Sequence, residues 1–435
     1  MPKVWNAARG NDETPYDLSA SMLRTRVQIL PLDTAYSQAR FQVITPDNKR
    51  FEIDNSARCL LDYLQKPRTT ADLLAAAERE RWQFGGATID FAFIQEQLLK
   101  RGLVELCGLP IDSDDRAIPK PMASGGRYTF LWLHYDIFER AMLQPVTRIL
   151  AVLFSHVGIL LGVLFTIVTH ALLLDSLWRT TTPVTPSAED WWILVGILYG
   201  SVLWHELGHA AACERFGAEH GPIGVGLFLV YPVMYCNVTD TWKLSRTQRI
   251  TVDIAGIYFH CLFASVFCIL ALRHPSPLLF WVVASVWGMI MFNLNPFFKF
   301  DGYWVLSDLL GISSLHRIST VLWRRTLLLN RDPRAYREIR ELPRKIRLTV
   351  FSYSAVYAVA MAYFAERIVC WIVPRFVSLL TKDLPKILLR IEAKQFDAIL
   401  LAQVFQLLLV LLFAYGGLLF LTTGIIAIFR ALRKT

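Results

Sequence analysis

The sequence predicts a mainly α-helical, polytopic membrane protein of about six spans with a small α+β domain at its N-terminus. Three observations predict this class. Hydrophobic residues make up 54% of the 435 residues and charged residues only 19%, which is too apolar for a soluble protein of this length. Apolar runs of about 20 residues, the length that crosses a bilayer, occur only after residue 148. The residues before them alternate short strand-like and helix-like patterns.

We divide the chain into residues 1–107, a folded N-terminal domain; residues 108–147, a linker and an interfacial helix; and residues 148–435, the membrane domain. Within the first region, residues 40–45 and 50–53 surround a turn-forming stretch and predict a β-hairpin. Three short helices and an extended stretch at residues 103–106 follow. The second helix begins at the capping pair Thr69 and Asp72, and Gly102 ends the third.

This order of elements resembles the winged-helix peptide-recognition domains related to the pyrroloquinoline-quinone biosynthesis protein D. The resemblance implies a cytoplasmic winged-helix-like domain that captures a leader peptide by adding it as a strand to the hairpin edge. A plain packing or oligomerisation domain is an equal alternative. Residues 1–147 have nearly balanced charge, so we expect no nucleic-acid partner.

Residues 108–127 have linker composition, with three prolines and a pair of glycines at 125 and 126. Residues 128–143 alternate aromatic and charged side chains. We interpret this second stretch as an interfacial helix that leads into the membrane.

The basic excess of the chain lies in the membrane half, which is typical of positive loops on the cytoplasmic side of a cell membrane. Ten Lys and Arg against three acidic residues occupy residues 313–347, which predicts a cytoplasmic loop there and both termini in the cytoplasm. Residues 1–30 lack the pattern of a cleavable signal peptide. Residues 374–397 are amphipathic and basic although this topology places them outside. We expect six spans, at about residues 149–175, 191–212, 252–272, 278–300, 347–373 and 398–429.

The second predicted span ends in an HExxH motif formed by His205, Glu206 and His209. Histidines four apart lie on one helix face and can bind one zinc ion, while Glu206 can act as general base on a water at the metal. The alternative is an ordinary solvated helix face. Ionisable groups in an apolar span are costly without a compensating metal or polar cavity, so the position favours Zn²⁺.

Two histidines and a water leave one zinc ligand missing, and a carboxylate is the usual complement. The fourth predicted span ends near Asp301, after Pro296 interrupts the helix and before Gly302 allows a close backbone approach. We therefore predict Asp301 as the third ligand. A thiolate from Cys213 or Cys236 is the weaker alternative.

An HExxH motif on one span and an NxxPxxxxDG pattern on a later one resemble the site-2 protease family of intramembrane zinc metalloproteases. The similarity covers roughly residues 190–305, and it implies that Asp301 binds zinc and that Asn293 helps to position the substrate. Asn295 does not occupy the matching position. Ile257 departs from the pattern, because the family often has proline after the preceding Ala-Gly pair. The glycine-rich residues after the motif resemble the family's membrane-associated β-rich segment: Gly221, Gly224 and Gly226.

Other polar residues of the spans receive weaker interpretations. His156, His170 and His260 either line a water path or pack in the bundle, and packing is favoured. Cys261 and Cys268 lie on one helix face and are interpreted as small packing residues.

These residues together predict an intramembrane zinc endopeptidase acting on a small or membrane-associated peptide. Its partners would be a peptide or membrane-anchored protein substrate, the lipid bilayer and an exporter, in maturation or export of a ribosomally made peptide. The alternative is a non-proteolytic zinc-binding partner of a peptide exporter, or an immunity protein; the intact Glu206 argues against it. A transporter is not supported, since the spans show no internal repeat.

Overall fold

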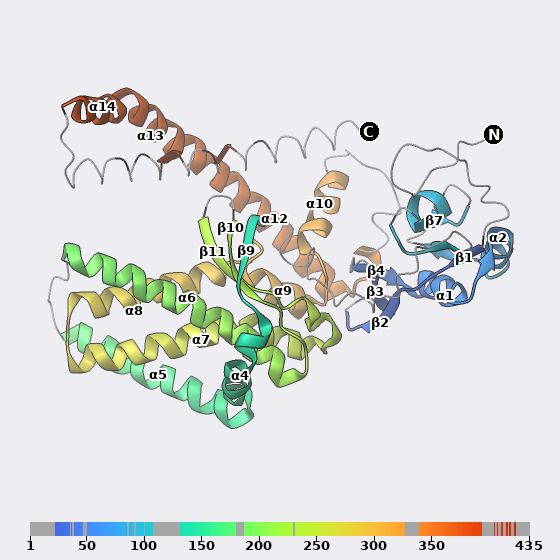
Figure 1. The fold of residues 1–435 in the computed structure, drawn as a ribbon, viewed down its shortest axis with the longest axis horizontal. Helices are drawn as coiled ribbons and strands as arrows, with labels where there is room; N and C mark the ends of the chain where they lie inside the picture. The colour runs from blue at the N-terminus through green and yellow to red at the C-terminus, as the bar shows by residue number, and fades with distance from the viewer. Residues whose placement is uncertain are drawn as a thin grey trace.

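The computed structural model describes residues 22–107 with short gaps, residues 131–179, 187–228, 231–326 and 339–393, and scattered residues between 404 and 422. The predicted linker at residues 108–127 and most of the predicted sixth span lie outside the described residues. A unit of short strands and helices, which we call the N-terminal unit (residues 22–107), lies at one end of a bundle of long helices (Figure 1).

The N-terminal unit contains a three-stranded antiparallel sheet, which helices follow in the chain. Its strands are β2 (Gln28–Leu32), β3 (Arg40–Ile44) and β4 (Arg50–Asp54), in the order β2-β3-β4. The predicted hairpin is therefore confirmed, with Arg40 opposite Asp54. Helix α1 (Asn55–Tyr63) follows directly, and the Asp54 carboxylate caps it by accepting the backbone N–H of Ala57 at 2.8 Å.

The predicted start of the second helix is also confirmed. Thr69 accepts the backbone N–H of Asp72 at 3.1 Å at the start of α2 (Thr70–Arg79). The described residues of the third predicted helix include a short π-helical segment, η1 (Ile94–Leu99), and Gly102 follows it with φ of 70°. The remaining strands form two small pairings: β1 (Met22–Arg24) between β5 (Arg68–Thr69) and β8 (Glu105–Cys107), and β6 (Gln83–Phe84) with β7 (Ala87–Thr88).

A second three-stranded antiparallel sheet belongs to the membrane half. It consists of β9 (Leu131–Phe138), β10 (Ile223–Phe228) and β11 (Tyr231–Cys236), in the order β11-β10-β9. The prediction of an interfacial helix at residues 128–143 is therefore wrong at residues 131–138, which form strand β9. Alternating aromatic residues fit a strand as well as an amphipathic surface, and the partner strand β10 lies some 90 residues later, which local pattern cannot reveal. Helix begins only at α4 (Arg140–Leu150).

Four helices form the bundle beside this sheet. Helix α7 (Arg246–Arg273) packs against the other three (Figure 1). These are α5 (His156–Arg179), α6 (Ala188–Phe216) and α8 (Pro277–Asn293). Short 3-10 turns precede α5 and α7 at Ala151–Phe154 (η2) and Thr239–Lys243 (η3).

Three helical stretches among the described residues are long and apolar enough to cross a membrane: His156–Leu177, Arg246–Arg273 and Arg344–Glu392. Helix α8 is a shorter apolar helix. The chain is therefore mainly helical and has the character of a membrane protein.

The third stretch does not end at residue 373, where the predicted fifth span ends. It continues through α12 (Arg344–Arg367), η4 (Ile368–Ile372), α13 (Val373–Ser378), η5 (Leu379–Asp383) and α14 (Leu384–Glu392). The π-helical segments η4 and η5 each come just before a proline, Pro374 or Pro385. Proline cannot donate the next helical hydrogen bond, and the wider π turn absorbs this loss without ending the helix. The described residues between α8 and α12 include two shorter helices, α9 (Asp301–Leu310) and α10 (Leu315–Thr326).

Candidate metal centre

Helix α6 carries the HExxH motif on a buried face. A capping box of Ser187 and Asp190 begins the helix, and Gly217 ends it in the left-handed conformation with φ of 77°. His205, Glu206 and His209 are all buried. Gly256 of α7 makes this close packing feasible, because a Cβ atom there would lie 2.4 Å from the His205 ring and 2.6 Å from His209 Nε2.

Asp301 reaches the two histidines because the chain breaks between α8 and α9. Helix α8 ends at Asn293, before Pro296, and α9 begins at Asp301. The predicted close backbone approach at Gly302 is confirmed, since a Cβ there would lie 2.1 Å from the Leu294 carbonyl oxygen. The break therefore turns the first residue of α9 toward α6.

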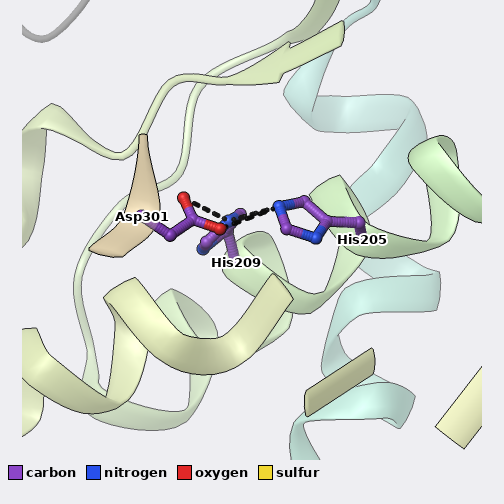
Figure 2. A group of neighbouring side chains, drawn as sticks. All are labelled: His205, His209 and Asp301. Atoms are coloured by element: carbon purple, nitrogen blue, oxygen red, sulfur yellow. Dashed lines mark hydrogen bonds and ion pairs between the residues drawn. The ribbon is translucent and has the colours of Figure 1, made fainter. Parts of the chain in front are cut away.

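The three side chains converge through their terminal atoms (Figure 2). Asp301 Oδ2 lies 3.0 Å from His205 Nε2, and Asp301 Oδ1 lies 3.4 Å from His209 Nε2. The two Nε2 atoms are 3.2 Å apart. Ligand atoms at about 2.0–2.1 Å around a tetrahedral zinc ion are separated by about 3.3 Å, so these spacings match such a site.

The chemistry of the donor set also fits a cation. Asp301 Oδ2 is buried and accepts no hydrogen bond from the described residues, despite its closeness to His205. Two imidazole nitrogens and one carboxylate oxygen are donor types that zinc binds in proteins.

Helix α7 supplies hydrogen-bond partners for the outer nitrogens of both histidines. His209 Nδ1 donates to the Val252 carbonyl oxygen at 2.7 Å. His205 Nδ1 lies 3.1 Å from His260 Nδ1. A metal on Nε2 leaves the hydrogen of His205 on Nδ1, so a neutral His260 would accept it there. Such outer partners orient the ligands of metal sites.

His260 is the residue that sequence reasoning missed, because packing was the favoured interpretation. Its spacing from Gly256 in the sequence could have identified it. The two residues are four positions apart, so they share one face of α7, the face that packs against the motif. By contrast, His170 of α5 contacts the Thr166 carbonyl oxygen at 2.8 Å and the Trp287 ring, away from the three converging side chains. Cys261 and Cys268 take part in apolar clusters of the bundle, as predicted.

A cavity of about 500 Å³ opens beside the three converging side chains. Glu206 and Asn293 both line it, so the structure brings all five predicted site residues to one place. The Glu206 carboxylate also accepts the backbone N–H of Cys236 at the end of β11. Asn295 is used differently, since its side-chain oxygen caps the backbone N–H of Phe297 at 2.8 Å.

The cysteines near the motif do not belong to the converging group, which among the described residues consists of His205, His209 and Asp301. Cys236 lines the cavity beside that group. Cys213 is buried in the apolar cluster around α6 and α7.

Comparison with known proteins gives one informative match. The chain is 27% identical over 135 residues to the "putative peptide zinc metalloprotease protein YydH" of Bacillus subtilis (strain 168). This match covers 30% of the chain, and the chain spans about half (54%) of the length of that protein. No family model matches the chain, and no solved structure matches it. The similarity supports a zinc metalloprotease, in agreement with the His205, His209 and Asp301 group.

Proposed function

We propose that this chain is an intramembrane zinc endopeptidase of the site-2 protease type. One observation carries the proposal: two imidazoles and a carboxylate converge at zinc-like spacing beside Glu206, on a cavity within a bundle of apolar helices. A relative named as a peptide zinc metalloprotease supports the same class.

The residues divide the work as zinc hydrolysis requires. A zinc ion bound to His205, His209 and Asp301 would lower the pKa of a bound water toward about 7 and polarise a peptide carbonyl. Glu206 takes the water's proton as general base, oriented by the backbone N–H of Cys236. Asn293, on the same cavity, donates a hydrogen bond to the substrate carbonyl oxygen.

The cavity favours a locally unwound substrate, because a helix hides its peptide groups within its own hydrogen bonds. Apolar side chains such as Met234, Phe292 and Trp304 line it, which suits a small apolar peptide or a membrane-anchored segment. We propose further that the N-terminal unit captures a leader peptide at a sheet edge, in the maturation or export of a ribosomally made peptide, with an exporter as partner.

The same proposal includes a topology. Six spans with both termini in the cytoplasm place the metal centre toward the cytoplasmic side. The basic residues 313–347 support this orientation, and α10 within that segment is a short amphipathic helix.

The decisive test separates metal binding from catalysis. Full-length protein in nanodiscs is assayed for zinc content and for cleavage of a mixed fluorogenic peptide library. We expect Glu206→Gln to retain zinc and to lose cleavage by at least about 100-fold, since proton transfer contributes about 10²–10⁴-fold. His205→Ala and Asp301→Ala should both lower zinc content.

Glu214→Gln is the matched control, because Glu214 lies on the same helix but near Arg140 and Arg148. It should leave zinc content and cleavage unchanged. Full cleavage by the Glu206→Gln variant would contradict the proposed mechanism. Zinc binding without cleavage in the unmodified chain would instead favour a non-proteolytic zinc-binding partner of an exporter.

A further inference from the structure

The N-terminal unit docks directly on the helices that follow the candidate metal centre. Arg40 Nη2 of β3 lies 2.9 Å from Glu341 Oε2, and both side chains are largely buried. Ser313 donates a hydrogen bond to Glu52 of β4. Tyr36 is buried in one apolar cluster with Tyr303 of α9 and residues of α10 and α12. Three separate contacts therefore hold this unit against the membrane half.

A fourth contact passes through a buried arginine. Arg249, in the first turns of α7, is 2% exposed and divides its guanidinium among three segments. Nε donates to Asp308 Oδ1 of α9 at 2.9 Å, and Nη1 donates to the Leu244 carbonyl at 3.0 Å. Nη2 donates to the carbonyl of Asp33, just after β2, at 2.9 Å. The Asp33 side chain in turn accepts the backbone N–H of Arg246 at 3.0 Å.

These bonds join the two elements that shape the metal centre. Helix α7 supports the histidines through Val252, Gly256 and His260. Helix α9 begins with Asp301 and carries Asp308 two turns later. A short helix moves as a rigid body, so a displacement at Asp308 is transmitted to Asp301. The Arg249–Asp308 pair thus sets the carboxylate relative to the imidazoles.

We propose that Arg249 is a positioning residue of the metal centre and couples docking of the N-terminal unit to the placement of Asp301. The proposal rests on the proposed function only in taking Asp301 and the two histidines as the metal ligands. A buried guanidinium that loses one of its acceptors must find another, because an unsatisfied buried charge is very costly. When the Asp33 carbonyl departs, Arg249 shifts and α9 shifts with it.

The test measures metal binding in the full-length protein. Co²⁺ replaces zinc, its dissociation constant is obtained by competition with a chelator, and its visible absorption reports the ligand geometry. We expect Arg249→Lys to raise the dissociation constant by about 10-fold or more and to change the absorption spectrum, as loss of an outer partner does in metal sites. Lysine keeps the charge but cannot bond to three segments at once.

Asp33→Ala tests the contribution of the N-terminal unit by itself. Asp33 is exposed, so this change leaves the fold intact while it loosens the segment that offers its carbonyl to Arg249. We expect a shift in the same direction that is smaller than that of Arg249→Lys. Arg140→Lys is the matched control, because Arg140 pairs with Glu219 at 2.8 Å, away from α9. It should leave both readouts unchanged.

Two further outcomes make the test decisive. If Arg249→Lys does not fold, the apolar pair Arg249→Met with Asp308→Leu replaces it, since buried ion pairs tolerate such exchange. Unchanged Co²⁺ affinity and absorption in both the Asp33→Ala variant and the foldable Arg249 variant would overturn the proposal. A parent protein that binds Co²⁺ in this way but cleaves no peptide would remove the peptidase proposal alone.

Discussion

At the scale of single residues, the candidate metal centre depends on α7 as much as on the ligands themselves. Val252 and His260 fix the outer nitrogens of the two histidines, and Gly256 leaves room for both rings. Val252 acts through its carbonyl oxygen, His260 through a ring nitrogen, and Gly256 through its lack of a side chain. Each can therefore be tested separately.

Replacing His260 with Phe should raise the zinc dissociation constant by about 10–100-fold, because His205 loses the acceptor for its Nδ1 hydrogen. Competition titration with a chelator measures this change. His260→Asn should recover part of the affinity, since its amide oxygen can accept the same hydrogen. His170→Phe, in α5, serves as control and should bind zinc normally; equal affinities in all variants would contradict the role of His260.

Replacing Gly256 with Ala should abolish stoichiometric zinc binding, because the new Cβ would lie 2.4 Å from the His205 ring. Metal analysis of the purified protein gives the result. The control is Gly200→Ala in α6, where the new Cβ would meet no atom within 4 Å beyond its own neighbours in the helix. That change should keep zinc and stabilise the helix by about 0.5–1 kcal/mol. Normal zinc content in the Gly256 variant would show that the packing can relax.

At the scale of elements, the layer formed by α9, α10 and α12 contains a buried titratable group. His316 of α10 lies between Tyr303 and Tyr357, with ring centroids 4.4 Å and 4.9 Å away. Burial, and then the charge of Lys299, lowers the pKa of His316 to about 4. The folded layer therefore holds this imidazole in its neutral form at neutral pH.

This lowered pKa predicts an acid-labile layer. Unfolded His316 binds a proton below pH about 6.5, whereas folded His316 does so only near pH 4. The stabilising contribution is complete above pH about 6.5 and is lost as the pH falls toward 4, by at most about 1.4 kcal/mol per pH unit. Unfolding measured across this range should show the slope, and His316→Gln should reduce it. The exposed His134→Gln variant should retain the slope; an unchanged slope in His316→Gln would exclude this residue as its source.

At the scale of the whole molecule, the sequence predicts local features well and contacts between distant segments poorly. The hairpin of β3 and β4, the cap at Thr69 and the chain break at Pro296 all follow from neighbouring residues. Strand β9 was missed because only its pairing with β10, far along the chain, distinguishes it from an amphipathic helix.

The candidate site shows the same division between local and distant information. The HExxH spacing identifies its own residues, and the pattern around Asp301 adds the third side chain. The contact between Arg249 and Asp33 joins positions 216 residues apart, and neither belongs to a motif. Tertiary packing alone brings them together, so sequence reasoning had no signal for it.

The docking of the N-terminal unit can be tested by charge exchange. Arg40→Glu should weaken docking, since two carboxylates would face each other where side chains are only 11% and 17% exposed. Glu341→Arg should do the same, and the double exchange should restore docking. Hydrogen exchange around Tyr36 reports the change, with several-fold faster exchange expected in the single variants. If the double variant exchanges as fast as the single ones, the pair does not hold the unit in place.

Under the proposed function, the part of α6 beyond its motif sets a minimum length for a substrate segment that enters from the end of this helix. The helix continues seven residues past His209 to Phe216, which is about 10 Å along its axis. An extended peptide advances about 3.3 Å per residue. A chain that enters from the end of α6 must therefore supply about three extended residues before its scissile bond arrives at the imidazoles. A folded partner tethered by a shorter arm would stay out of range, so under the proposed function the length of α6 beyond His209 would limit which chains are cleaved.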